Sequence, residues 1–208
     1  NDLSSQTLRV FDKHIHTNKG FYSLPEADLF EMEYWSLEQA KLGKSTRKPL
    51  QGKVAVITGG AGTIGKACAE KILFHGGNVV LIDKDKKELE KVTLNFNSDC
   101  VRSLDIDITK PNASDEILKF VTNFFGGADI LISNAGSAVE GMTDELESQK
   151  FRDSFELNFF SHYELAKEFI KFYKHTNNKG QILFNISKQS INPGVNFGAY
   201  GIPKLSII

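Results

Sequence analysis

The stretch Val54-Ala55-Val56-Ile57-Thr58-Gly59-Gly60-Ala61-Gly62-Thr63-Ile64-Gly65 decides the fold. An apolar, mostly β-branched run leads directly into a glycine-rich turn, and a helical pattern of small and apolar residues follows from Ala67. A continuous apolar run is typical of a parallel strand that is buried on both faces. Glycines let the turn approach a pyrophosphate, and the free N–H groups of the next helix face the phosphates. The stretch therefore predicts a dinucleotide-binding strand, turn and helix, with a plain βα turn as the alternative.

An acidic residue ends the next predicted strand, Asn78-Val79-Val80-Leu81-Ile82-Asp83. Asp83 lies 18 residues after Gly65, close to the spacing of an acid that binds the hydroxyls of the adenosine ribose. A carboxylate at this place favours NAD, because it repels the additional 2′-phosphate of NADP. The alternative is that Asp83 is only a surface acid at the end of a strand.

The composition indicates a soluble globular protein. The 208 residues are 40% hydrophobic and 25% charged, which is enough for one good domain and an extension. The net charge of −1 argues against nucleic acid or an anionic membrane as a partner. No apolar run is long enough to span a membrane, and no signal-peptide pattern is present. We therefore expect a cytoplasmic protein in which Cys68 and Cys100 are free thiols.

The first fifty residues differ from the rest of the chain. Helices are predicted over residues 7–17 and 23–42, and the polar, basic segment 43–51 is predicted to be a linker. His14 and His16 are two residues apart and do not share a helical face, so we expect no metal site there. Residues 1–50 are thus predicted to be a helical extension and linker.

From Lys53 onward, strand patterns alternate with helix patterns. This order predicts an α/β fold with a doubly wound parallel sheet, Rossmann-like, over residues 51–208. The strands are predicted at 54–58, 78–83, 100–104, 129–133 and 181–186, and the helices at 64–75, 86–95, 115–125 and 145–174.

Several motifs together resemble those of the short-chain dehydrogenase/reductase family. They are Thr58-Gly59 through Ile64-Gly65, Asn134-Ala135-Gly136, Asn158, and Tyr200-Gly201-Ile202-Pro203-Lys204. The stretch 30–42, with Lys188-Gln189 and Asn192-Pro193-Gly194, further resembles the C-terminal dehydrogenase half of bifunctional aldolase/short-chain dehydrogenase proteins. This second resemblance implies that residues 1–50 are the tail of an aldolase half and the join between the two halves.

Asp83 favours NAD as the cofactor, and the resemblance assigns further residues to its binding. Asp107 is expected to bind the adenine edge, or alternatively only to cap a turn, and Asn134 is expected to support the central sheet. Thr63 departs from the family pattern, which has glycine there, so either its side chain points away from the pyrophosphate or cofactor affinity is reduced. The cofactor-binding candidates are Gly59, Gly62, Thr63, Ile64, Gly65, Asp83, Asp107, Ile108, Asn134, Ala135, Gly136, Tyr200 and Lys204.

Tyr200 and Lys204 are the principal catalytic candidates. They are four residues apart and share a face if the segment is helical. The charge of a nearby Lys⁺ favours tyrosinate, which can act as a general base. The resemblance further implies that Lys204 binds the nicotinamide ribose and that Asn158 holds a water in the proton relay. The alternative for Asn158 is a polar residue that bends a helix.

The catalytic serine is open to three interpretations. Ser187 lies 13 residues before Tyr200, which is the family's spacing for the serine that stabilises charge on the substrate oxygen. Counting from Asn185 instead puts Lys188 in that role, and Ser190 is a further candidate. We predict Ser187.

The predicted function is hydride transfer between NAD and a small hydroxy-aldehyde, sugar or polyol alcohol, similar to lactaldehyde. The alternative is a nucleotide-binding module without turnover that serves as a scaffold for a fused aldolase. A sugar-nucleotide epimerase is disfavoured, because that group spaces its glycines differently. We expect a small-molecule substrate and a homo-oligomer. We also expect the last strands and the substrate lid to lie beyond Ile208, where the sequence stops inside a helix.

Overall fold

The computed structural model describes residues 48–208, so the helices predicted over 7–17 and 23–42 lie outside the described residues. Five strands form one parallel sheet in the order β3-β2-β1-β4-β5. The doubly wound parallel sheet predicted from the sequence is therefore confirmed. The strands are β1 (Val54–Thr58), β2 (Asn78–Asp83), β3 (Val101–Asp105), β4 (Ile130–Ser133) and β5 (Gln181–Phe184).

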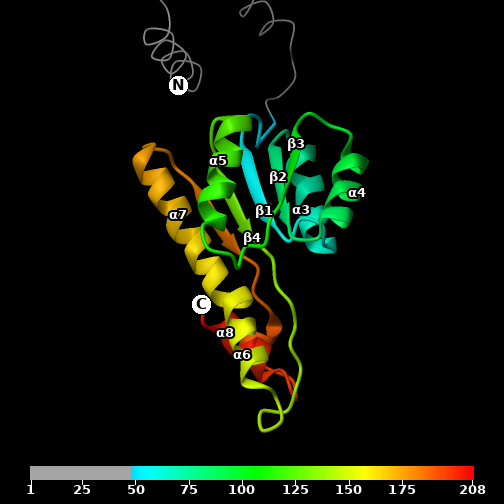
Figure 1. Cartoon of the computed structure of the whole chain (residues 1–208). Coiled ribbons are helices and arrows are strands. Elements are labelled where there is room, and N and C mark those ends of the chain that lie inside the picture. The colour runs from blue at the N-terminus through cyan, green and yellow to red at the C-terminus, as the bar shows by residue number, and fades with distance from the viewer. Residues whose placement is uncertain (1–47) are drawn as a thin grey trace, which may run out of the picture. The chain divides into compact units, whose positions relative to one another are not determined.

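Helices cover both faces of the sheet (Figure 1). On one face, apolar residues of α3 (Thr63–Phe74) and α4 (Lys86–Phe96) form one core cluster with Ala55 and Ile57 of β1. On the other face, α5 (Ala113–Phe125) and α7 (Ser161–His175) contribute to a second cluster that includes Val54 and Val56. Alternate residues of one strand thus enter two separate cores, which explains why the β1 sequence is apolar throughout. Burying each large side chain contributes about 1.5–3 kcal/mol, so β1 fixes the sheet between its two helical layers.

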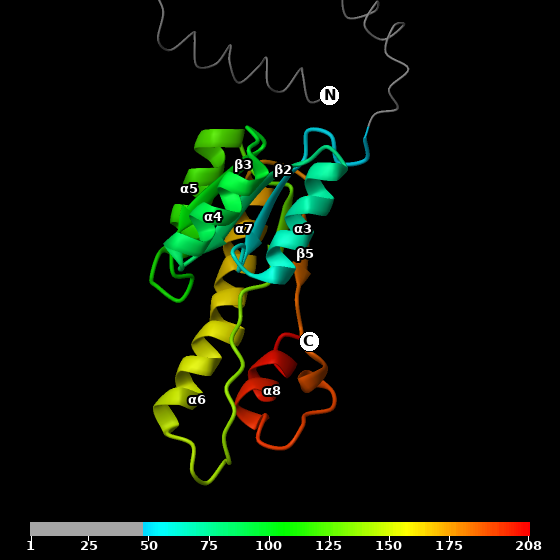
Figure 2. The ribbon, with the colours of Figure 1, turned by 90° about the vertical axis from the view of Figure 1, so that its right-hand side faces the viewer.

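The remaining elements lie beyond the carboxyl ends of the strands (Figure 2). They are α6 (Ser148–Phe155), the π-helical turn η1 (Glu156–Phe160), the 3₁₀ turn η2 (Lys188–Ser190) and α8 (Gly198–Leu205). The helix predicted over 145–174 is in fact three consecutive segments, α6, η1 and α7. The π-helical turn inserts an extra residue into the helical repeat and turns the side chains on either side of it relative to one another.

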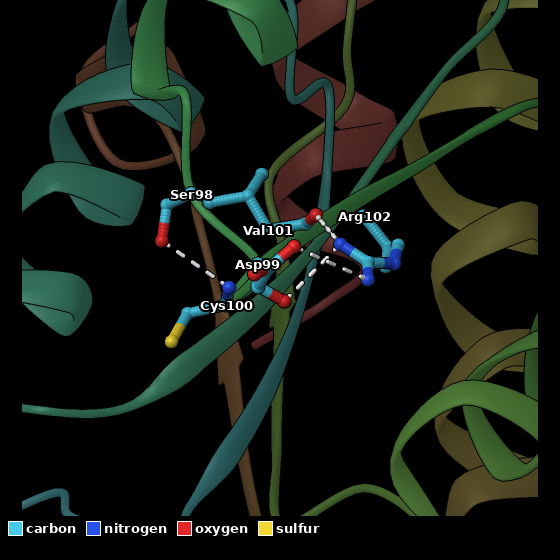
Figure 3. Close-up of polar contacts among 5 residues, drawn as sticks. All are labelled: Ser98, Asp99, Cys100, Val101 and Arg102. Carbon is cyan, nitrogen blue, oxygen red and sulfur yellow. Dashed lines mark hydrogen bonds and ion pairs between the residues drawn. The ribbon is translucent and has the colours of Figure 1, made fainter.

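The start of β3 is fixed by local polar contacts (Figure 3). The Ser98 hydroxyl accepts a hydrogen bond from the N–H of Cys100 at 3.2 Å. The guanidinium of Arg102 donates to the carbonyls of Asp99 and Val101 at 3.1 Å and 2.8 Å. These contacts hold Ser98–Cys100 in a turn, so β3 begins at Val101, one residue later than predicted. The Cys100 thiol is free and exposed.

Between residues 48 and 208, none of the helices combines the length and the apolar composition that crossing a membrane requires.

Gly65 permits the close contact between α3 and the turn that precedes it. A Cβ atom at residue 65 would lie 2.2 Å from the Gly59 carbonyl oxygen, whereas one at Gly62 would lie 3.3 Å from the same atom. The backbone oxygen cannot move without shifting the turn. We therefore predict that Gly65→Ala lowers the free energy of unfolding by about 1–3 kcal/mol, although alanine is the better helix former.

The matched control is Gly62→Ala, whose Cβ makes a much milder contact with the same oxygen and should lower the midpoint of thermal unfolding far less than Gly65→Ala does. Circular dichroism during heating measures both variants. Equal stability of Gly65→Ala and Gly62→Ala would contradict this account of the turn.

Candidate active site

The turn between β1 and α3 leaves the start of the helix open. The N–H of Gly62 donates to the Gly59 carbonyl at 3.1 Å, and Gly62 offers no side chain to cap α3. Gly62, Thr63 and Ile64 are exposed, so the side chain of Thr63 lies at the surface. The first N–H groups of a helix have no partner within it. Together with the positive end of the helix dipole, they favour an anionic group such as a phosphate.

Asp83 ends β2 beside this turn and is already bonded on both carboxylate oxygens. Its Oδ2 accepts from the N–H of Ala61 and its Oδ1 from the N–H of Asp85, both at 3.1 Å. The spacing in the sequence predicted that Asp83 binds the adenosine ribose, but it did not predict the hydrogen bond from Ala61 in the glycine turn to Asp83. A carboxylate oxygen has two lone pairs. Asp83 can therefore hold the turn in shape and still accept hydrogen bonds from a ligand.

A cavity of about 300 Å³ opens at the carboxyl ends of the strands, next to β1. The strand order reverses at β1, and open α/β sheets bind ligands in the crevice at such a point. Six of the predicted cofactor-binding residues line this cavity, namely Gly59, Asp83, Asp107, Ile108, Ala135 and Gly136, together with Ile82, Lys84, Ile106, Ser137 and Leu157.

Asp107 lies in the wall of this cavity with a bonded carboxylate. Its Oδ1 accepts from the backbone N–H of Thr109 at 3.0 Å and from the Thr109 hydroxyl at 2.8 Å. Burial acts to raise the pKa of Asp107, but the two bonds from Thr109 and the charges of Lys84 and Lys110 lower it below its ordinary value. Asp107 is thus an ionised acceptor that also caps a turn.

Asn134 joins the carboxyl ends of three strands. Its side-chain N–H₂ donates to the Thr58 carbonyl at 2.9 Å, and its Oδ1 accepts from the side-chain amide of Asn185 at 2.8 Å. The backbone N–H groups of Asn134 and Ala135 donate to the Thr58 hydroxyl at 2.9 Å and 3.0 Å. These bonds hold the ends of β1, β4 and β5 in one arrangement.

Asn158 lies in the π-helical turn and is fully buried. Its side-chain N–H₂ donates to the Ser137 carbonyl at 3.0 Å and to the Ser154 hydroxyl at 3.1 Å, and its Oδ1 accepts from the N–H of Ser137 at 3.2 Å. The Ser154 hydroxyl in turn donates to the Ala199 carbonyl at 2.7 Å. Asn158 therefore connects the loop after β4 to the first turn of α8.

Gly136 brings the cavity into contact with α8. A Cβ atom at residue 136 would lie 2.9 Å from Oδ1 of Asn158 and 3.3 Å from Nζ of Lys204. Asn158, Lys204 and the wall of the cavity thus meet at one point, where only a glycine fits without displacing a neighbour.

Lys204 is almost completely buried, with 2% of its surface exposed. Its Nζ donates to the Asn185 carbonyl at 3.2 Å and lies 3.3 Å from Nε2 of His162. Nδ1 of His162 lies 2.6 Å from the Ser133 hydroxyl. Burial lowers the pKa of Lys204 to about 8. Burial, and secondly the charge of Lys204, lower the pKa of His162 to about 4, against a smaller opposing effect of the Ala135 carbonyl.

Tyr200 is half-buried on α8, one turn before Lys204, so the two residues share a face as the sequence suggested. Ser187 precedes η2, and its hydroxyl accepts from the N–H of Gln189 at 3.2 Å. Lys188 is exposed, whereas Ser190 is 4% exposed and donates its hydroxyl to the Ser187 carbonyl. Of the two serines, Ser190 is buried and already donates its hydroxyl hydrogen. The Ser187 hydroxyl is partly exposed and only accepts, so its hydrogen remains available for a substrate oxygen.

The structure thus brings Asn158, Gly136 and Lys204 together and places Tyr200 on the same helix as Lys204. Sequence reasoning missed His162, Ser133 and the carbonyl of Asn185. A signal for His162 was present, because it follows Asn158 by four residues, the spacing of neighbours on one helical face. Within 48–208, no three His, Cys, Asp or Glu side chains are grouped so that they could hold a metal ion.

Comparison with known proteins agrees with this geometry. The family model described as short chain dehydrogenase matches residues 53–208. A second model, described as aldolase class II, second domain, matches residues 1–42. The uncharacterized oxidoreductase YuxG of Bacillus subtilis (strain 168) is 31% identical over 189 residues, which are 88% of this chain but 27% of YuxG. The chain therefore spans about a quarter of the length of that relative.

Two solved structures share the fold at 27% identity. The 3-ketoacyl-(acyl-carrier-protein) reductase of Brucella melitensis, complexed with NADH, has a TM-score of 0.71 over 76% of this chain and 66% of its own. The L-sorbose reductase of Gluconobacter frateurii, complexed with NADPH and L-sorbose, has a TM-score of 0.72 over 78% of this chain and 62% of its own. With the site geometry and the match over residues 53–208, these findings show that the chain belongs to the short chain dehydrogenase family.

Proposed function

We propose that this chain transfers a hydride between NAD and the carbinol carbon of a small hydroxy-aldehyde, sugar or polyol. Gly136 carries the proposal, because it lines the cavity with Asp83 and Asp107 and also lies against Lys204. A dinucleotide whose adenosine end contacts Asp83 and Asp107 can therefore extend along the cavity to the helix that bears Tyr200. The NADH in the related Brucella melitensis reductase supports a nicotinamide cofactor.

The choice of NAD rests on Asp83. Its carboxylate stands at the end of β2, where it can accept hydrogen bonds from both ribose hydroxyls. A 2′-phosphate at the same place would bring negative charge against this carboxylate. The exposed start of α3 faces the pyrophosphate in this arrangement, and the surface position of Thr63 is compatible with it.

When bound, NAD supplies the acceptor for the hydride that leaves the carbinol carbon. Tyr200 takes the proton of the substrate hydroxyl as a general base. Lys204 favours the tyrosinate through its positive charge and binds the nicotinamide ribose. Ser187 donates a hydrogen bond to the substrate oxygen and stabilises the charge that develops there.

Asn158 holds the relay water through its backbone. Both hydrogens of its side-chain amide already bind Ser137 and Ser154. We therefore assign the water to the Asn158 carbonyl, since π-helical turns free backbone groups and are frequent at functional sites. The side chain keeps the loop after β4 and α8 in place.

A sugar or polyol substrate is supported by two comparisons. Residues 1–42 match the second domain of a class II aldolase, and one solved relative is an L-sorbose reductase bound to its sugar. Small polyhydroxylated substrates fit both observations.

A scaffold without turnover is the second candidate. The loop that carries the serine is irregular, because counting from Asn185 puts the exposed Lys188 in the place of the catalytic serine. Thr63 in the glycine turn also departs from the family pattern. Against this candidate, Tyr200 and Lys204 are both present on one face of α8.

We also infer that the chain forms a homo-oligomer. A cavity of about 530 Å³ lies between α6 and α8 and is lined in part by Phe151, Phe155 and Ile202. Ile202 and Leu205 on α8 are 49% and 52% exposed. Exposed apolar side chains around a groove favour a protein interface, and sedimentation should show a dimer or a larger assembly.

The cofactor preference is tested by Asp83→Ala. We expect wild-type protein to bind NAD more tightly than NADP, and the variant to lose about tenfold, or 1.4 kcal/mol, of its NAD affinity. The preference should narrow, because the variant loses both the ribose hydrogen bonds and the repulsion of the 2′-phosphate. Calorimetric titration of the full chain measures both affinities, with the exposed Asp99→Ala as the control. Tighter binding of NADP than of NAD to the wild type would refute the assignment.

The catalytic base is tested by Tyr200→Phe, which removes the hydroxyl and little volume. Turnover should fall at least about 10²-fold, the lower range for the loss of acid–base catalysis, while NAD affinity persists. The matched control is Tyr163→Phe, because Tyr163 is 53% exposed on α7. Absorbance of NADH reports the rates with short hydroxy-aldehydes and polyols. Wild-type turnover by Tyr200→Phe would exclude the proposed mechanism.

The burial of Lys204 makes the stability of the cofactor-free protein depend on pH. Its pKa is 10.5 when unfolded and about 8 when folded, a difference that corresponds to roughly 3 kcal/mol. Below pH 8 both states carry the proton and the folded state bears the full cost. Between pH 8 and 10.5 the folded state releases the proton first, so stability rises with pH.

Lys204→Met removes this cost. Relative to the wild type, the variant should therefore gain most stability below pH 8 and lose that advantage by pH 10.5. Urea unfolding at several pH values measures the difference, and the exposed Lys174→Met controls for the loss of one positive charge. An advantage that does not change with pH would show that the Lys204 charge is not destabilised by burial.

A further inference from the structure

A buried polar chain runs from the sheet to Lys204, and its first two members have no role in the mechanism above. It consists of the Ser133 hydroxyl at the end of β4, the His162 imidazole on α7 and the Lys204 ammonium on α8. Ser133 is 0%, His162 1% and Lys204 2% exposed. Polar groups buried to this extent are retained when they bond one another, because an unpartnered one costs stability.

The contact with the Lys204 ammonium selects one tautomer of His162. A lysine ammonium has hydrogens to donate and no lone pair. Nε2 of His162, which lies 3.3 Å from Nζ of Lys204, must therefore carry the lone pair. The proton of the neutral ring is then on Nδ1 and is donated to the Ser133 hydroxyl 2.6 Å away. A serine hydroxyl can donate or accept, so Ser133 is compatible with this tautomer and fixes the orientation of the ring.

Neutral acceptors surround the Lys204 ammonium on the elements packed against α8. His162 faces it from α7, the Asn185 carbonyl from the end of β5, and the Asn158 amide lies across Gly136. Tyr200 is the titratable neighbour on α8 itself. Among the ion pairs of the described part of the chain, none joins Lys204 to a carboxylate. The positive charge is therefore held by hydrogen bonds to neutral groups.

We propose that His162 is a positioning residue, whose neutral imidazole, oriented by Ser133, holds the Lys204 ammonium against Gly136 at the end of the dinucleotide cavity. The inference rests on the proposed function, in which that ammonium acts on Tyr200 and the nicotinamide ribose. His162 itself touches neither substrate nor cofactor. Asn158 and His162 lie four residues apart, and both approach Lys204 from the consecutive segments η1 and α7. One helical run therefore positions both the residue proposed to hold the relay water and the residue that accepts from Lys204.

The first test is the tautomer of His162 in the cofactor-free full chain, read from a long-range ¹H–¹⁵N spectrum of the histidine rings. We expect a neutral ring protonated on Nδ1 at pH 7. The His162 signal is assigned as the one that disappears from the spectrum of His162→Gln. A ring protonated on Nε2, or on both nitrogens, would overturn the proposal, because neither form can accept from Lys204.

The second test follows the titration of Lys204 by ¹³C NMR of lysine labelled at Cε, assigned by its absence in Lys204→Met. His162→Leu removes the acceptor from the ammonium, so the midpoint should fall by about one pH unit, a tenfold loss of proton affinity. His162→Gln offers a carbonyl oxygen in place of the ring nitrogen, so the Lys204 midpoint should lie between those of His162→Leu and the wild type. An identical midpoint in the wild type, His162→Leu and His162→Gln would refute the role of His162.

The two tests remain decisive if His162→Leu does not fold. Ser133→Ala leaves the imidazole in place and removes its orienting partner, so it should lower the Lys204 midpoint in the same direction by a smaller amount. Neither test depends on turnover. If the wild type oxidises no substrate while the midpoint depends on His162, the proposed function fails and the positioning role stands. If the wild type turns over a substrate and the Lys204 midpoint is the same in the His162 variants, the positioning role fails and the proposed function stands.

Discussion

The hydrogen bonds of Asn134 are the constraint on which the site depends. By joining Thr58 and Asn185, they fix the carboxyl ends of β1, β4 and β5 relative to one another. The glycine turn starts from the first of these ends, and the carbonyl that holds Lys204 lies on the last. A shift of any one strand end would therefore misplace either the cavity or the lysine. Because the sheet is buried between two helical layers, this arrangement is set before a ligand arrives.

A buried cation without a carboxylate partner is costly for the fold, and here the cost has a functional counterpart. Lys204 is held by the lone pair of His162 and the carbonyl of Asn185, which accept from two of its three N–H donors without cancelling its charge. In the proposed mechanism, a carboxylate beside it would neutralise the positive charge that Lys204 brings to the general base. In the proposed mechanism the protein therefore tolerates lower stability near neutral pH in exchange for an uncompensated positive charge beside the base.

The fold was largely predictable, because the glycine turn follows an apolar strand and the same alternation repeats to residue 186. Strand limits differed from the structure by two residues or fewer, as with β3, where the contacts of Ser98 and Arg102 set the start. The π-helical turn around Asn158 was not predictable, since the sequence of 156–160 reads as ordinary helix and the insertion follows from tertiary contacts. His162 was missed for a related reason. A lone histidine on a helix is ordinary in a sequence, and its role depends on Ser133 and Lys204, which are distant in the chain.

We propose that one continuous site runs from Asp83 to Lys204 along the carboxyl ends of the strands. A crystal structure of the full chain with NAD tests it most directly. We expect the adenosine ribose hydroxyls to bond Asp83, the pyrophosphate to lie at the start of α3, and the nicotinamide ribose to lie within hydrogen-bond distance of Lys204. A nicotinamide end directed away from α8, or an adenosine ribose without contact to Asp83, would contradict it.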